Sequence, residues 1–125
     1  MMELTINDVV FQFKFGMGFM REINRMLGKP IDGIPGAQEN IGMQYKIAGV
    51  ISGDCEALAD VLLAANKGFN PRVTQQLLDN YIDEVEDIDA FFQMVIDFLK
   101  QGNASKKITA TLLEEYEKQQ KKADA

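Results

Sequence analysis

The sequence predicts an α+β fold, mostly α-helical, in which an N-terminal β-hairpin packs against a bundle of about five or six helices. Hydrophobic residues alternate with period two as far as Phe15, and from Met17 onward they recur at helical spacing. A two-stranded hairpin alone is marginally stable in water, so helices are expected to cover its apolar face. The 125 residues have the length of one domain. We expect this domain to span residues 1–116, followed by a frayed or disordered tail at 117–125, which contains no apolar anchor.

The hairpin is expected to turn at Asn7 and Asp8, residue types that tolerate positive φ. Ile6 then pairs with Val9, and the residues before and after them pair in order. Cross-strand partners share a face, so one face is apolar and consists of Met2, Leu4, Ile6, Val9, Phe11, Phe13 and Phe15. The opposite face is mostly polar and consists of Glu3, Thr5, Val10, Gln12 and Lys14. A slip of one residue would invert this sorting, so the register is well specified.

A helix is predicted from Met17 to Leu27, with a polar side opposite an apolar stripe of Phe19, Ile23, Met26 and Leu27. The polar side consists of Arg21, Glu22, Asn24 and Arg25. Gly28 falls at a left-handed C-cap position and Pro30 prevents continuation. Two prolines and two glycines within residues 29–37 predict a surface loop. We disfavour phosphate binding by Gly33 and Gly36, because no strand–loop–helix phosphate motif fits.

Two helices are predicted next, at residues 38–51 and 55–66. The first has a wide apolar surface, so we expect it to be central, with Gly42 and Gly49 marking close approach of another element. This surface consists of Ile41, Tyr45 and Ala48, with Met43, Ile47 and Val50 near them. Asp54 is a natural N-cap for the second helix, whose apolar residues are Leu58, Val61, Leu62 and Ala65. Cys55 begins that helix. We interpret it as structural rather than reactive, because acidic neighbours oppose a thiolate and the chain has no histidine.

Three helices are predicted in the C-terminal half. Asn70 and Pro71 indicate the start of the first, as an N-cap residue followed by proline. The second covers residues 88–101, is capped by Asp87 or Asp89, and has an apolar side of Phe91, Phe92, Val95, Ile96 and Leu99. The last begins at Asn103 or Ser105 and carries one narrow apolar stripe of Ile108, Leu112 and Tyr116. This stripe either packs on its own domain or binds a partner.

Acidic residues gather between the first two of these helices. A calcium loop starting at Asp83 is excluded, because its third and sixth positions would be Val85 and Ile88. Two interpretations stay open: a solvated acidic turn, or a docking surface for a basic partner that includes Asp83, Glu84 and Glu86. Catalysis by two of these carboxylates is disfavoured, because a mobile turn provides no buried pair with separated pKa values.

Composition narrows the class of function. Thirteen basic and nineteen acidic residues give a net charge of −6, which opposes binding to nucleic acid or to an anionic membrane. The apolar runs are shorter than a bilayer span. A single cysteine forms no internal disulfide, which fits a reducing cytoplasm. No metal or cofactor motif is present, and without histidine a non-enzymatic role is favoured.

Three strings occur in order: ELTINDVVFQFKFGMGFMREIN, PIDGIPGAQENIGMQY and ANKGFNPRVT. Together they resemble the tail assembly chaperone family of long-tailed phages of Gram-positive bacteria, over roughly residues 2 to 105. Asp8 departs from the glycine expected in many relatives. The resemblance implies a non-enzymatic factor in the host cytoplasm that binds the tape measure protein and the major tail tube protein, allows self-association, and is absent from the virion. A structural virion component of the tail or neck is the alternative.

The resemblance also implies that some ribosomes change frame near the end of the gene and make a longer fused protein. Residues 119–122, Gln-Gln-Lys-Lys, are compatible with an adenine-rich slippery run, because both lysine codons begin with two adenines. An extension could leave the chain after Tyr116 without disturbing the core.

Overall fold

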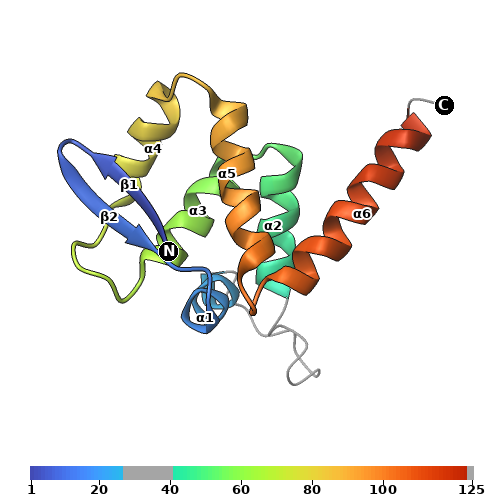
Figure 1. The fold of residues 1–125 in the computed structure, drawn as a ribbon, viewed down its shortest axis with the longest axis horizontal. Coiled ribbons are helices and arrows are strands. Elements are labelled where there is room, and N and C mark those ends of the chain that lie inside the picture. Colours follow the sequence, from blue (N-terminus) through green and yellow to red (C-terminus); the bar gives the residue numbers. More distant parts are fainter. Residues whose placement is uncertain (27–40, 124–125) are drawn as a thin grey trace.

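The fold is described from a computed structural model, which covers residues 1–26 and 41–123. A two-stranded antiparallel sheet precedes six helices in this described part of the chain (Figure 1). The predicted class, α+β and mostly α, is confirmed. The elements are β1 (Met2–Ile6), β2 (Val9–Phe13), α1 (Met17–Met26), α2 (Ile41–Ser52), α3 (Cys55–Asn66), α4 (Gln75–Glu84), α5 (Ile88–Gln101) and α6 (Lys106–Ala123).

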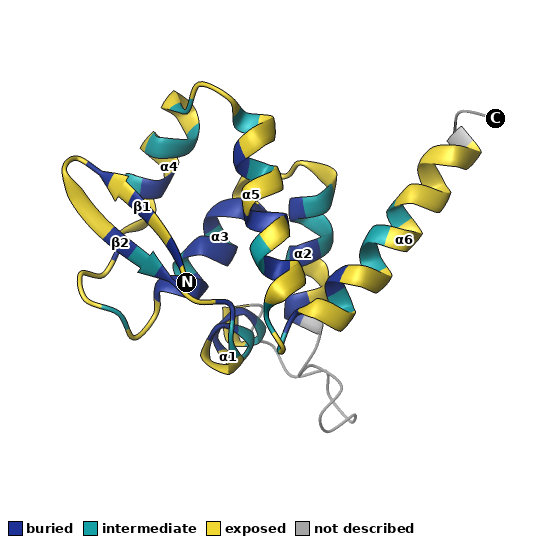
Figure 2. Cartoon of the chain, in the orientation of Figure 1, coloured by how far each residue is buried: buried dark blue, intermediate teal, exposed yellow. Residues whose placement is uncertain are grey.

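The hairpin has the predicted turn and register. Asn7 and Asp8 have φ values of 51° and 66°, so both central residues are left-handed. Ile6 pairs with Val9, and the pairing continues to Met2 and Phe13. Every residue assigned to the apolar face is buried except Val9, whose side chain is 42% exposed. Val9 lies beside the turn, where the tip of the hairpin projects beyond the helices that cover its base (Figure 2).

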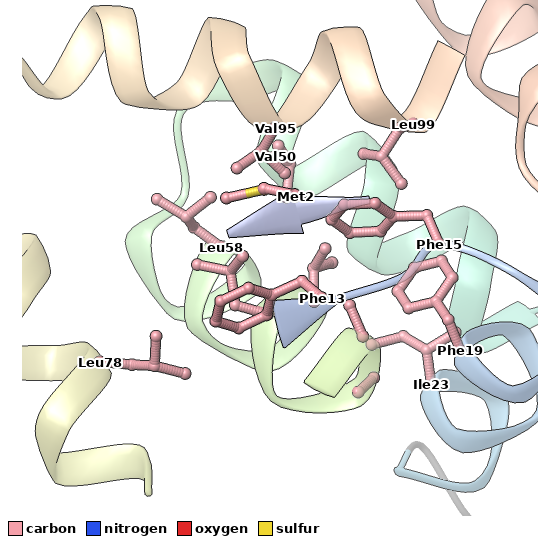
Figure 3. Packing of buried hydrophobic residues seen from close by; sticks show 14 of the residues in the cluster. Met2, Phe13, Phe15, Phe19, Ile23, Val50, Leu58, Leu78, Val95 and Leu99 are labelled. Carbon is pink, nitrogen blue, oxygen red and sulfur yellow. The ribbon is translucent and has the colours of Figure 1, made fainter. Parts of the chain in front are cut away.

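The buried face of the hairpin joins one core with α1, α2, α3 and α5 (Figure 3). Phe13 is fully buried, next to Leu58 of α3 in this view. The Phe15 ring packs edge-to-face on Phe19 at a centroid distance of 5.2 Å. Aromatic pairs in this arrangement add to the stabilisation from burial alone. Phe15 therefore fixes α1 against the end of β2.

Helix α2 is central, as predicted, and contacts α1, α3, α5 and α6. Its glycines mark two close approaches rather than one. A Cβ atom on Gly42 would lie 2.7 Å from the Ile23 carbonyl oxygen of α1, and one on Gly49 would lie 2.7 Å from the Cβ of Ala57 in α3. Tyr45, expected on the apolar surface of this helix, is instead 68% exposed. The apolar surface is therefore narrower than the sequence suggested.

The predicted start of α4 at Asn70 and Pro71 is wrong. The helix begins at Gln75, and the side chain of Thr74 caps it by accepting a hydrogen bond from the Leu77 amide. Residues 70–73 are held in a non-helical path, because the buried Asn66 side chain accepts hydrogen bonds from Val73 N at 2.7 Å and Arg72 Nη1 at 2.7 Å. The tertiary hydrogen bonds override the local N-cap signal.

The same Asn66 amide connects three parts of the fold. Its Nδ2 donates to the Gln12 carbonyl of β2 at 2.9 Å and to the Pro71 carbonyl at 3.4 Å. Asn66 itself is 0% exposed, and its hydrogen bond with Val73 N is buried, whereas the other three are partly buried. Asn66 thus joins the end of α3, the edge of β2 and the segment before α4. Neither helical spacing nor a motif distinguishes this residue in the sequence.

Other local predictions are mixed. Asp54 and Asp87 cap α3 and α5 as expected, and Ser105, rather than Asn103, immediately precedes α6. Met26, placed on the apolar stripe of α1, is exposed, and Glu22, placed on the polar side, is buried. The predictions for Leu27, Gly28, Pro30, the loop at 29–37 and its glycines Gly33 and Gly36 lie outside the described residues.

Helix α6 continues through Ala123, whereas residues from 117 onward were expected to fray. Its first half lies against α2 and α5, and its second half projects away from the domain (Figures 1 and 2). Glu114 and Lys118, like Glu117 and Lys121, are four residues apart, a spacing that stabilises exposed helices. Lysines in the last turn also favour the C-terminal end of the helix dipole. The division of the chain into a domain and a tail at residue 116 stays a prediction.

Candidate protein-binding surfaces

The acidic residues singled out in the sequence lie at the turn between α4 and α5. Asp83, Glu84 and Glu86 are all exposed, and none of them forms an ion pair with another described residue. Asp87 closes the turn by accepting a hydrogen bond from the Ala90 amide at 3.0 Å. The turn therefore presents three unneutralised carboxylates to solvent, and their role in binding stays a prediction.

Glu84 also lines a groove of about 370 Å³ between β1 and α4. Thr5 and Asn7 form its strand side, and the helix side continues with Leu77, Asn80, Tyr81 and Val85. Polar and apolar side chains both contribute to this lining. The groove depends on α4 lying beside the hairpin, so spacing within the sequence does not reveal it.

The apolar stripe of α6 lies at the base of the helix. Ile108 and Leu112 are half-buried and pack against the hydrophobic core, as does Leu113. Tyr116 is half-buried where α6 leaves the domain, and it lines two grooves on either side of that point. Ile108 and Leu112 thus have packing partners in their own domain, while Tyr116 borders accessible space.

One of these two grooves brings Tyr116 toward the acidic segment. It measures about 470 Å³ and is lined by α5 residues that include Asp89 and Phe92, together with Ile51 of α2. Asp83, Glu84 and Glu86 do not line it. The two sets of candidate residues therefore belong to separate surfaces, one beside the hairpin and one at the base of α6.

Sequence reasoning missed an apolar groove of about 480 Å³ where the hairpin meets the turn between α5 and α6. Met1 and Met17 are exposed on its rim, and Phe98 lies half-buried in its lining. Gly102 allows the two segments to meet, because a Cβ atom at this position would clash with the Phe15 carbonyl oxygen. Methionine side chains are flexible and polarisable, so such a groove can adapt to apolar partners of varied shape. The signal in the sequence was Met17, an apolar residue off the buried stripe of its helix.

A family model described as "Phage tail assembly chaperone protein, TAC" matches residues 3–114. The match spans the hairpin, the acidic turn and the packed base of α6. The chain belongs to this family. Comparison of the chaperone with curated proteins and with solved structures gave no match. Of the predicted site residues, Tyr116 alone lies beyond the matched range.

Among the described residues of the chaperone, one carboxylate is buried, that of Glu22 in α1, whose side chain is 6% exposed. Arg25 donates to both of its oxygens, through Nε at 3.2 Å and Nη2 at 2.5 Å, and Lys67 Nζ donates at 2.5 Å. The hydrogen bond from Arg25, followed by that from Lys67, lowers the pKa of Glu22 from 4.5 to about 2, against the opposing effect of burial. Because Lys67 follows α3, the ion pair joins the ends of two helices. Its position indicates a structural role.

Within residues 1–26 and 41–123, the Cys, Asp and Glu side chains form no group of three or more that could hold a metal ion. None of the helices of the chaperone in this described part is long and apolar enough to cross a membrane. Cys55 is exposed at the first residue of α3. Its assignment as an unreactive residue stays a prediction.

Proposed function

We propose that this chaperone binds the tape measure protein and the major tail tube protein during assembly of a long phage tail, in the cytoplasm of a Gram-positive host, and leaves before the virion is complete. The observation that carries the proposal is the family match over residues 3–114. The role requires neither catalysis nor a cofactor. Binding and release of partner proteins are sufficient.

Physical chemistry explains why such a binder is needed. A long protein that forms coiled coils exposes apolar seams until the tail tube encloses it, and large exposed apolar surfaces promote aggregation. The groove at Met1, Met17 and Phe98 supports the proposal, because it offers accessible apolar area on the folded domain. Tyr116 at the base of α6 offers a second apolar contact beside a groove. Both surfaces suit contact with an amphipathic helix.

Co-expression with the tape measure protein tests the proposal. We expect the tape measure protein to be soluble and to co-purify with the chaperone, and to aggregate without it. Met17→Glu should reduce co-purification, whereas Val10→Glu should not. The two residues are 49% and 46% exposed, but Val10 lies outside the groove. If both variants captured the tape measure protein equally well, the groove at Met1, Met17 and Phe98, here called the methionine groove, would not be its binding site. A tape measure protein that stays soluble alone would argue against the chaperone role.

Analysis of purified phage particles separates this role from the alternative. Mass spectrometry of the particles should detect the tail tube protein and not the chaperone. Detection of this chain in stoichiometric amounts would instead identify a structural component of the tail or neck. Co-purification of the tail tube protein from infected cells tests the second proposed partner.

The frameshifted product is part of the same proposal. We propose that a longer form of the chain continues from the projecting end of α6, with the extension contributing to the tape measure contact. The polar, exposed surface of residues 117–122 supports it, because an added segment would disturb no buried contact. Reading the nucleotides over codons 115–125 and probing infected cells for a longer band tests this. A gene without a slippery sequence and with one product would remove the mechanism.

A further inference from the structure

The pairing of the hairpin determines which backbone groups of β1 point away from β2. In a hairpin with a two-residue turn, the flanking residues Ile6 and Val9 form a hydrogen-bonded pair, and such pairs alternate with non-hydrogen-bonded ones. Leu4 therefore directs its N–H and C=O groups toward β2. Glu3 and Thr5 direct theirs to the outer edge of β1. This edge offers two donors and two acceptors.

The two edges of the sheet differ in what covers them. On β2, the Gln12 carbonyl accepts from Asn66 Nδ2 at 2.9 Å, and Lys14 N donates to the Ala65 carbonyl at 2.9 Å, so the end of α3 covers that edge. On β1, no group in the described residues hydrogen-bonds to the outward backbone of Glu3 or Thr5. An edge of this kind is a template for pairing with another chain.

At Thr5 the β1 edge opens into the groove beside α4, whose lining combines polar and apolar side chains with one negative charge. Leu77, Tyr81 and Val85 provide half-buried apolar side chains, and Glu84 is the one charged residue of the lining. Asp83 and Glu86 lie next to it on the acidic turn. No lysine or arginine occurs in the sequence between residues 72 and 100. An occupant with positive charge is therefore favoured over an acidic one.

We propose that the groove between β1 and α4 binds an extended, positively charged segment of a partner protein, which adds to the sheet as a third strand. Its backbone pairs with the outward groups of Glu3 and Thr5. Since side chains alternate along a strand, one set contacts Leu77 and Tyr81 and a basic residue reaches Glu84. The acidic turn then has a function as part of this site.

A second copy of this chain fits the groove less well. Its β1, Met-Glu-Leu-Thr-Ile, carries one acidic and no basic residue, and its β2, Val-Val-Phe-Gln-Phe, carries no charge. The lysines of residues 118–122 lie on the α6 helix, not on an extended segment. The strand addition itself does not depend on the proposed function. Only the identity of the partner does, because the proposed function implies that the bound segment belongs to a tail protein.

Nuclear magnetic resonance of the isotopically labelled chain tests the proposal with a synthetic peptide of about seven residues that alternates valine and lysine. We expect the amide resonances of Glu3 and Thr5 to shift and the exchange of the Thr5 amide hydrogen to slow. A valine–glutamate peptide is the charge control. A valine–lysine peptide N-methylated at alternate residues is the backbone control, because it lacks the donors that pair with the edge. Both control peptides should bind at least roughly tenfold more weakly than the valine–lysine peptide.

Variants of the chain provide a second test of strand addition. Thr5→Pro removes an outward donor from the edge, and Glu84→Lys reverses the charge of the lining; each should weaken the peptide roughly tenfold. Glu114→Lys makes the same charge change on exposed α6 and should have no effect. The proposal would be overturned if Glu84→Lys bound the valine–lysine peptide with wild-type affinity, or if the N-methylated peptide bound as tightly as the unmodified one. The comparison of the two peptides uses the wild-type chain, so it remains valid even if Thr5→Pro fails to fold.

Two other outcomes would also overturn it. Dimerisation of the chain alone, measured by light scattering and abolished by Thr5→Pro, would assign the edge to a second copy. Failure of the valine–lysine peptide to shift Glu3 and Thr5, while the tape measure protein still co-purifies, would refute the strand addition and leave the proposed chaperone function standing.

Discussion

Replacing Glu22 with glutamine should change how the stability of the fold depends on pH. The pKa of Glu22 is about 2 in the folded chain, against 4.5 for an ordinary glutamate. Each unit of pKa corresponds to about 1.4 kcal/mol, so ionised Glu22 contributes at most about 3 kcal/mol to the free energy of unfolding at neutral pH, because solvent screens the exposed charges of Arg25 and Lys67. Because the folded pKa is the lower one, this contribution is complete above the unfolded pKa. It is lost as the pH falls toward the folded pKa, mostly between about pH 5 and pH 2.

Urea unfolding followed by circular dichroism at a series of pH values measures this contribution. The chain has nineteen acidic residues, so the difference between wild type and Glu22→Gln is the informative quantity. We expect that difference to be largest at pH 7 and to shrink, by at most about 3 kcal/mol, as the pH falls through the window above. Glu84→Gln, at an exposed carboxylate, is the matched control and should keep the wild-type pH dependence. Parallel stability curves for wild type and Glu22→Gln would refute the reasoning.

Three further predictions concern the core and the surface. Phe13→Ala should cost about 3–5 kcal/mol in chemical unfolding and Gln12→Ala little, and equal losses would show that the hairpin faces are wrongly assigned. Asn66→Ala should cost roughly 2–4 kcal/mol, because it removes the partner of the buried Val73 N–H and of two partly buried carbonyl groups. Hydrogen exchange should then accelerate both in β2 and at Val73, and faster exchange in only one of them would contradict the joining role. With a net charge of −6, the chain should give no gel shift with DNA or RNA at physiological salt; a salt-sensitive shift at micromolar protein would refute this.

The parts of the fold that the sequence predicted well are those determined by neighbours along the chain. The hairpin register follows from Asn7 and Asp8 and from strict alternation, and both are local. Helices α3 and α5 begin and end at the predicted residues, because Asp54 and Asp87 cap them and glycines follow their ends. Local hydrogen bonds and backbone preferences are sufficient to place these boundaries.

The errors arise where residues distant in sequence compete with local signals. Asn66 draws residues 71–73 out of the helical path that Asn70 and Pro71 suggested. Glu22 has a polar position on its helix by spacing, yet Lys67, 45 residues away, makes its burial favourable. Neither partner can be inferred from a periodicity that describes one helix at a time.

The candidate binding surfaces also divide into features that the sequence predicts locally and features that depend on residues distant in the sequence. The exposure of the acidic turn was predicted correctly from its composition, since a run of carboxylates without cations favours solvent. The groove that Glu84 shares with Thr5 was not predicted, because it exists only where α4 lies beside the hairpin. The methionine groove likewise combines the hairpin end with a turn about 85 residues later. Sequence patterns identified the side chains and the fold determined their neighbours.

The projecting half of α6 has a consequence for anything attached to it, because a helix transmits direction as well as distance. Each residue of an α-helix advances about 1.5 Å and rotates about 100° around the axis. Between Tyr116, where α6 leaves the core, and Ala123, the helix therefore advances about 10 Å. If the proposed frameshifted extension exists and continues the helix, its rotational phase is set by the number of residues that separate it from Tyr116. Inserting one residue between Tyr116 and the extension would then turn the extension by about 100° while advancing it by only about 1.5 Å.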